Sequence, residues 1–203
     1  MFTGEQMSID SGIQTRIYRA AFLLFAEKGG IDITVSELAQ KAGLARGTIY
    51  NHLSSTQTLF EEVATQLTRE MTEFVLKATK DESDPARRLS IGIRLFLKKS
   101  HDEPDWGKFL IRFGLSSGTL KALWEGPLVE DLQNGIKSGK FKVGSDQTAS
   151  VLTLIGASTL GSMSLVREGT KTWKDASAEI VELILKALGV PLVEAKKLAR
   201  KQY

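Results

Sequence analysis

The amino-acid sequence of 203 residues predicts an all-α protein with an N-terminal three-helix domain and a larger C-terminal helical domain. Three observations predict this fold class, with about nine helices in total. Almost every apolar pattern repeats at the helical period. No segment alternates apolar and polar residues as a half-buried strand does. Capping residues, glycines and prolines mark the helix starts and ends.

The first two helices have clear start and stop signals. Residues 11–28 form the first helix, and the glycine pair 29–30 ends it. Thr34 is a favourable N-cap with Glu37 three residues later, so the two form a capping box that starts the second helix. The apolar face of this helix consists of Val35, Leu38, Ala39 and Ala42. Gly43 then suits the left-handed position that ends a helix.

A third short helix, residues 45–53, follows the turn residue Leu44. Its buried side needs only Ile49 and Leu53. The other residues face outward: Arg46, Gly47, Thr48, Tyr50, Asn51 and His52. A cation, hydroxyls and an amide on one exposed helix face can contact base edges and phosphates. The pattern indicates a helix-turn-helix that reads DNA, although ordinary helical hairpins also place two short helices around a glycine.

Residues 17–63 resemble the N-terminal domain of the tetracycline-repressor (TetR) family of bacterial transcription regulators. The resemblance rests on the first helix with its terminal glycine, the second helix and turn, the recognition helix and the start of a fourth helix. The matching residues are Ile17, Ala20, Ala21, Leu24, Phe25, Ala26, Glu27, Lys28, Gly29, Thr34, Val35, Gly43, Leu44, Arg46, Gly47, Thr48, Ile49, Tyr50, His52, Ser55 and Leu59. The chain departs from the family pattern at Gly30, usually an aromatic, and at Leu53, usually phenylalanine. Thr56 stands where a lysine commonly contacts a phosphate.

We expect a distinct role for each residue of this DNA-binding surface. Thr34 caps the second helix and approaches a phosphate. Three residues face bases: Arg46, Thr48 and Asn51. Gly47 lets the backbone come close, and Tyr50 and His52 hold phosphates.

The sequence predicts a series of longer helices in the C-terminal part of the chain. Residues 55–80 form a fourth helix, and the acidic stretch 81–84 ends it. Asp84 and Pro85 then start a fifth helix. The remaining helices are a sixth opening at residues 103–104, a seventh region over 117–138 interrupted at 126–127, and two more over 146–168 and 176–188.

Six aromatic residues in these helices are candidates for a small-molecule cavity, which the family resemblance implies: Phe74, Phe96, Trp106, Phe109, Phe113 and Trp124. Ligand cavities are mostly apolar with a few polar groups, for which Arg94, Arg112 and Ser116 are candidates. Ordinary core packing is the alternative for each aromatic residue.

The last two helices are candidates for a dimer interface. One is dense in small residues that allow close helix packing, and the other carries an apolar stripe. The interface residues we expect are Gly156, Leu160, Gly161, Ile180, Leu183, Ile184 and Leu188. Packing within one monomer is the alternative. A dimer is favoured because one short recognition helix reads few base pairs, and two-fold symmetry doubles the site.

Composition excludes several other classes. The chain has no cysteine, its formal net charge is +3, and its only histidines are His52 and His101. No catalytic triad, metal-binding motif or phosphate loop occurs, so we expect no enzyme activity, no cofactor and no metal. Residues 1–55 carry five basic and five acidic residues, so net charge does not support DNA binding. The segment 151–166 contains several serines and threonines and falls short of a membrane span. We expect a cytoplasmic protein without a membrane partner.

The sequence therefore predicts a ligand-responsive transcriptional regulator, acting as a repressor, that binds a palindromic operator as a homodimer. Its domains are residues 11–63, which bind DNA, and 64–203, which bind ligand and dimerise. Its partners are double-stranded DNA, a small-molecule effector and a second copy of itself. The alternative is a helical ligand-binding or scaffold protein with weakened DNA binding, which Thr56 and the neutral N-terminal region favour.

Overall fold

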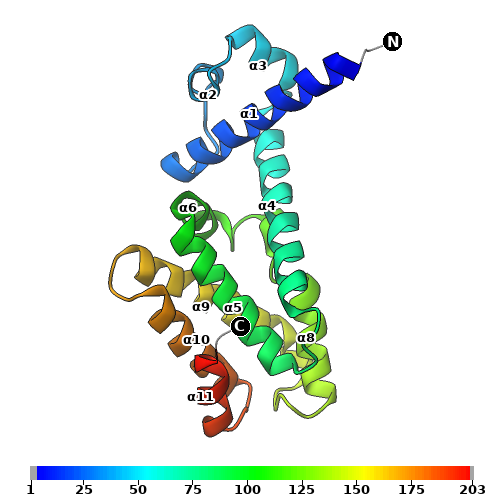
Figure 1. Ribbon diagram of the computed structural model, residues 1–203, viewed down its shortest axis with the longest axis vertical. Coiled ribbons are helices and arrows are strands. Elements are labelled where there is room, and N and C mark those ends of the chain that lie inside the picture. The colour runs from blue at the N-terminus through cyan, green and yellow to red at the C-terminus, as the bar shows by residue number, and fades with distance from the viewer. Residues whose placement is uncertain (1–3, 202–203) are drawn as a thin grey trace. The chain divides into compact units, whose positions relative to one another are not determined.

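The computed structural model describes residues 4–201, and side chains from residue 12 onward. Within this range the chain forms α-helices and one 3-10 turn without any strand, which confirms the predicted all-α class. In chain order the elements are α1 (Gly4–Lys28), α2 (Val35–Ala42), α3 (Arg46–His52), α4 (Thr56–Thr79), α5 (Pro85–Asp102), α6 (Pro104–Phe113), α7 (Gly118–Lys121), α8 (Gly126–Lys137), η1 (Ser145–Gln147), α9 (Thr148–Arg167), α10 (Trp173–Ala187) and α11 (Leu192–Arg200) (Figure 1).

Two features of this order differ from the prediction. The first helix begins at Gly4 rather than at residue 11. The stop signal at residues 189–191 does end α10, but Pro191 also stands at the N-cap position of a further helix, α11. Proline is well tolerated at a helix start, so the same residue ends one helix and precedes the next.

The chain folds as two compact units that divide between Leu67 and Thr68, inside α4. In the first unit, α1 packs against α2 and α2 against α3. Phe25 of α1 and Phe60 of α4 meet edge to face, with ring centroids 5.4 Å apart. The buried apolar side chains of this unit come from all four helices, and they include Ile17, Phe25, Leu38, Ile49, Leu59 and Phe60. Burial of this set holds the short α2 and α3 in place.

In the second unit α5 is the central helix and packs against α6, α8, α9, α10 and α11 (Figure 1). The Asp84 carboxylate caps α5 by accepting a hydrogen bond from the Ala86 N–H at 3.0 Å, and Pro85 occupies the first helical position. Because α5 contacts neighbours on several sides, even Arg87 and Arg94 are buried. Both guanidinium groups donate to the backbone carbonyl of Lys201, at 3.0 and 2.7 Å.

The helix α9 is more apolar than the sequence analysis allowed. Within the described residues, the stretch 145–167 is long and apolar enough to cross a membrane by length and composition alone, despite its serines and threonines. In this fold α9 packs against α5, α6, α8 and α10. Its buried side chains include Val151, Ile155, Leu160 and Met163. Packing on four neighbours accounts for the apolar character of α9.

Candidate DNA-binding surface and ligand cavity

The start of α2 is a complete capping box. The Thr34 hydroxyl accepts a hydrogen bond from the Glu37 N–H at 3.2 Å, and the Glu37 carboxylate accepts one from the Thr34 N–H at 2.8 Å. At the other end Gly43 adopts the left-handed conformation, with φ of 63° and ψ of 40°. The capping box and the glycine turn predicted from the sequence are both present.

An arginine side chain secures the turn between α2 and α3, a role that sequence reasoning missed. Arg16 of α1 donates through Nη2 to the carbonyls of Ala42 and Gly43, at 2.8 and 2.7 Å. These carbonyls lie at the end of α2, where they lack helical partners and attract a cation. The pairing spans 26 residues of sequence, so no local pattern could reveal it.

The helix α3 separates its buried and outward residues as predicted. Ile49 is fully buried and Leu53, just after the helix, is half-buried. Thr48 is half-buried at the edge of the outward face. The exposed residues are Arg46, Gly47, Tyr50, Asn51 and His52. Tyr50 is 68% exposed, unusual for a large aromatic side chain and suited to contact with a partner molecule.

The carboxylate of Glu37, which caps α2 next to this surface, remains charged down to low pH. Lys28 Nζ lies 2.7 Å from Glu37 Oε1. The hydrogen bond from Lys28, followed by those from the Thr34 backbone and hydroxyl, lowers the pKa of Glu37 from 4.5 to about 2. Because the Thr34 hydroxyl donates to this carboxylate at 2.9 Å, a phosphate at this helix end would have to compete with Glu37 for that donor.

The second unit contains a cavity of about 60 Å³ between helices. Its lining comes from α4, α5, the segment before α8, α8 and α9, and consists of Met71, Thr72, Val75, Arg88, Leu89, Gly92, Ile93, Phe96, Leu123, Trp124, Pro127, Leu128, Asp131, Ile155 and Thr159. Most of these side chains are apolar. A cavity of this composition is typical of a small-molecule site.

Two of the six aromatic residues expected at a ligand site do line this cavity. Phe96 and Trp124 stack on one another with ring centroids 5.0 Å apart, and the Trp124 indole donates to the Gly114 carbonyl at 3.1 Å. The other four do not line the cavity: Phe74, Trp106, Phe109 and Phe113. Phe74 is 48% exposed on α4, while Trp106 and Phe109 are buried in the core. Helical periodicity identifies apolar faces, but it does not distinguish core from cavity wall.

The expected polar partners also lie elsewhere. Arg94 is buried against the end of α11, and Arg112 and Ser116 are exposed. The cavity instead contains Arg88 and Asp131, whose side chains are joined 2.5 Å apart. Their separation of 43 residues hides this pair from sequence reasoning.

One sequence signal for the cavity was available in α5. A glycine inside a helix costs about 1 kcal/mol relative to alanine, so Gly92 in an otherwise favourable helix needs a structural reason. A Cβ added at Gly92 would meet Val75 Cγ1 at 3.8 Å, an ordinary contact across the cavity wall. The absence of a side chain at Gly92 therefore leaves space between α4 and α5.

The residues expected at a dimer interface divide into two groups. Four of them are buried within the monomer: Gly156, Leu160, Ile184 and Leu188. At Gly156 an added Cβ would lie 3.1 Å from the Trp124 ring, so its small size serves packing inside one chain. Gly161 and Leu183 are exposed and Ile180 is half-buried. Two further apolar residues are exposed on α9, Leu154 and Leu165.

Both units match families of known regulators. Residues 17–63 match the family described as bacterial regulatory proteins, tetR family. Residues 84–201 match the tetracyclin repressor-like C-terminal domain. These regions define a helix-turn-helix regulator that binds DNA. The chain belongs to the tetracycline-repressor family, which is a family of transcriptional regulators and not of enzymes.

Relatives and solved structures agree with this assignment. The chain is 30% identical over 89 residues to the HTH-type transcriptional regulator Rv1255c of Mycobacterium tuberculosis (strain ATCC 25618 / H37Rv), a match that covers 44% of this chain and 44% of that relative. It is 24% identical over 174 residues to the HTH-type transcriptional regulator YdgC of Bacillus subtilis (strain 168), covering 84% of this chain and 89% of YdgC. RolR, solved in complex with resorcinol, has the same fold with a TM-score of 0.72, at 21% identity over 95% of both chains.

Proposed function

We propose that this protein is a ligand-responsive transcriptional repressor that binds a palindromic operator as a homodimer. The observation that carries the proposal is the outward face of α3, which presents Arg46, Tyr50, Asn51 and His52 while Ile49 is fully buried. In this assignment residues 11–63 bind DNA, and residues 64–203 bind the effector and dimerise.

The side chains of the α3 face suit different parts of a DNA duplex. The base-facing residues are Arg46, Thr48 and Asn51, because a guanidinium and an amide match donor and acceptor patterns in the major groove. Tyr50 and His52 contact phosphates, and Gly47 allows the backbone to approach. Thr34 caps α2 and approaches a phosphate from that helix end.

The exposed apolar residues of α9 and α10 support dimerisation. Leu154, Leu165 and Leu183 are 42%, 38% and 57% exposed in the single chain, and Gly161 permits close approach between them. Apolar surface gathered on adjacent helices is characteristic of an interface. A two-fold dimer would place two recognition helices on the two halves of a palindrome.

The helix α4 supports coupling between ligand and DNA. It begins in the first unit and lines the cavity in the second with Met71, Thr72 and Val75. The complex of RolR with resorcinol supports a small-molecule effector for a protein of this fold. A ligand that changes the spacing of the recognition helices would lower operator affinity. By linkage, it would then bind free protein better than DNA-bound protein.

The direct test is fluorescence anisotropy with DNA from upstream of the protein's own gene. We expect specific binding by the wild type, weakened by about 1–3 kcal/mol in Arg46→Ala if the guanidinium reads a guanine. Arg200→Ala on α11 is the matched control, because it also removes one exposed arginine and should bind normally. Absence of any specific complex would favour the alternative, a helical ligand-binding protein with weakened DNA binding.

A further inference from the structure

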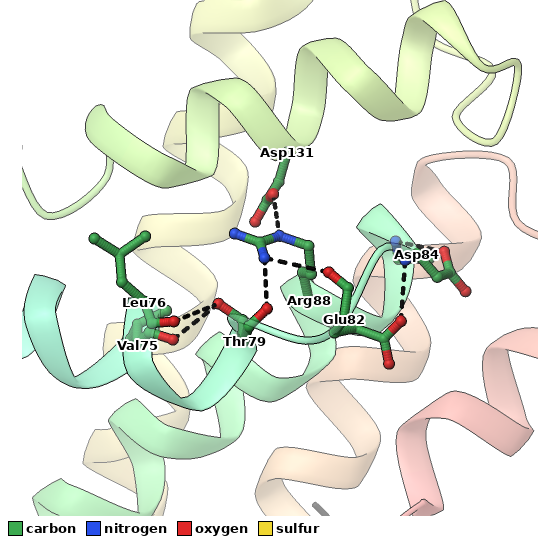
Figure 2. Close-up of polar contacts among 8 residues, drawn as sticks. Val75, Leu76, Thr79, Glu82, Asp84, Arg88 and Asp131 are labelled. Atoms are coloured by element: carbon green, nitrogen blue, oxygen red, sulfur yellow. Dashed lines mark hydrogen bonds and ion pairs between the residues drawn. The ribbon is translucent and has the colours of Figure 1, made fainter.

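The two charged residues of the cavity wall, Arg88 and Asp131, form a mostly buried ion pair. The Arg88 and Asp131 side chains are 19% and 13% exposed, and Arg88 Nε donates to Asp131 Oδ1 at 2.5 Å. Figure 2 shows the guanidinium between Asp131 of α8 and the C-terminal end of α4 with the segment that follows it. Arg88 Nη1 donates there to the carbonyls of Thr79 and Glu82, at 2.7 and 3.3 Å.

This network leaves one donor and one acceptor for a ligand. Among the side chains described, no hydrogen bond uses Arg88 Nη2 or Asp131 Oδ2, and neither atom carries a dashed line in Figure 2. Both residues line the cavity. Neither atom belongs to the fully buried unpartnered side-chain atoms of the described region, so both keep access to the space around them.

We infer that the cavity binds a small, uncharged, mostly apolar molecule carrying a hydroxyl group, which donates to Asp131 Oδ2 and accepts from Arg88 Nη2. This inference rests on the proposed effector site and names the chemistry of its ligand. A hydroxyl satisfies both atoms at once, because it holds one donor and two acceptor lone pairs. Most of the remaining wall is apolar, with Val75, Ile93 and Phe96 among its residues, and suits an apolar body. The Thr159 hydroxyl also lies in the wall, but it already donates to the Ile155 carbonyl at 2.7 Å.

Charged ligands fit this site poorly. Arg88 and Asp131 neutralise one another, so the cavity presents no net charge to an ion. An incoming carboxylate would meet Asp131 as a like charge, and an ammonium group would meet Arg88. Either ion would also lose its hydration in a largely apolar space. Burial raises the pKa of Asp131 by more than the hydrogen bond from Arg88 lowers it. The carboxylate is therefore incompletely solvated, and a further hydrogen-bond donor would stabilise its charged form.

The size of the cavity limits the ligand to a small molecule. Its volume is about 60 Å³. A cavity that holds a single water needs at least about 10–15 Å³, so this space exceeds one water and admits only a small molecule. Phenol is therefore a suitable probe, with toluene as its apolar match and benzoate as its anionic match.

The test is titration of the full-length protein with phenol, toluene and benzoate, followed by NMR chemical shifts. We expect phenol to bind at least tenfold more tightly than toluene or benzoate, because a site built for a hydroxyl leaves its polar groups unpaired against an isostere. Equal binding of phenol and toluene would overturn the inference. So would tighter binding of benzoate, or no binding of phenol.

Two variants on α8 sharpen the test. Asp131→Asn keeps the shape and can still accept from Arg88, but it replaces the acceptor Oδ2 by an amide donor. The preference for phenol over toluene should then fall at least fivefold. Gln133→Ala is the matched control, since this exposed residue of α8 does not line the cavity and should keep the full preference. An unchanged preference in Asp131→Asn would overturn the assigned contact.

A variant of α5 tests the location independently of the ion pair. Gly92→Val places side-chain atoms between α5 and Val75, so it should abolish binding of both phenol and toluene. Retained binding would place the ligand elsewhere. Anisotropy of the wild type on operator DNA is measured in parallel. Lost DNA binding would refute the proposed regulator, whereas an absent phenol preference with intact DNA binding would refute only the ligand class.

Discussion

Two glycines beside the recognition helix have different physical roles. Gly43 has φ of 63°, and an added Cβ would lie 3.1 Å from Arg16 Nη2. A side chain there would be strained by the backbone and would also disturb the arginine that holds the turn. Gly47 is helical, and apart from its chain neighbours and the backbone of its own helix, no described atom lies within 4 Å of the position of its Cβ. Folding therefore needs a glycine at position 43 but not at position 47.

We predict opposite effects of alanine at these two sites. Gly43→Ala should destabilise the protein by about 1–2 kcal/mol, the cost of a left-handed non-glycine residue, in urea denaturation. Gly47→Ala should leave stability unchanged or raise it by up to about 1 kcal/mol. If the α3 backbone approaches DNA at Gly47, this second variant should bind the operator more weakly. Full operator affinity of Gly47→Ala would mean that Gly47 is not a contact point.

Glu37 makes the capping box sensitive to pH in a defined window. Its pKa is about 2 in the folded protein, against 4.5 as the ordinary value. The lowered pKa means that the folded state holds the charged form more tightly than the unfolded chain does. Glu37 therefore stabilises the folded protein fully above pH 4.5, and this contribution is lost as the pH falls from 4.5 to about 2.

Carboxyl carbon NMR shifts measured against pH would test this prediction. The pKa of Glu37 should be found near 2, and Lys28→Met should raise it, because the hydrogen bond from Lys28 is the largest cause of the shift. Lys41→Met is the control, since Lys41 pairs with Glu27 at 2.5 Å and not with Glu37. Titration of Glu37 at its ordinary pKa in the wild type would show that the Lys28 contact is not formed in solution.

At the scale of elements, α11 is held by its end rather than only by its apolar face. Ser90 Oγ donates to the Leu198 carbonyl at 3.1 Å, and Arg87 and Arg94 donate to that of Lys201. All three donors lie on α5 and are buried. The last carbonyls of a helix lack partners within the helix and favour nearby cations. The side chains of α5 therefore supply the hydrogen-bond donors that the end of α11 lacks.

We predict that Arg94→Met destabilises the protein by about 1.5–3 kcal/mol, the usual contribution of a hydrogen bond to a charged group. Methionine preserves much of the side-chain packing, so the loss reports the polar contact. Arg112→Met on the exposed side of α6 should change stability by less than about 0.5 kcal/mol. Both values come from urea denaturation. Equal stability of the two variants would show that the contact with Lys201 contributes little.

At the scale of the whole molecule, two adjacent residues of α10 allow the proposed dimer interface and the core of the single chain to be tested separately. Leu183 is 57% exposed in the single chain, whereas Ile184 is 2% exposed. A dimer that uses the exposed face of α10 would bury Leu183, whereas Ile184 is needed for the fold of each chain.

We predict that Leu183→Glu yields a folded monomer that has lost specific operator binding, because like charges would meet across the two-fold axis. Ile184→Glu should instead unfold the second unit, since its carboxylate would be buried without a partner. Sedimentation and circular dichroism distinguish the two results. A Leu183→Glu variant that remains dimeric would place the interface on another face.

Much of the N-terminal unit could be predicted from sequence because its signals are local. The capping box of Thr34 and Glu37 spans three residues, and Gly43 is required by the turn that it forms. Ile49 is the buried residue of α3, and its position in the helix fixes which side faces outward. Interactions over such short distances depend little on the rest of the chain, so capping and periodicity suffice to predict them.

The tertiary structure alone decided which apolar faces close on a core, which line a cavity and which stay exposed. Periodicity identified the aromatic residues of the second unit but could not single out Phe96 and Trp124 as cavity walls. It also assigned Leu183 and Ile184 to the same dimer interface, whereas the packing of α10 leaves Leu183 exposed and buries Ile184. The same holds for the Arg88–Asp131 pair and for the anchoring of α11, which join residues 43 and more than 100 positions apart. The sequence by itself determined the all-α class and the helix-turn-helix, because these depend on neighbouring residues, whereas the sites of the second unit depend on how whole helices pack.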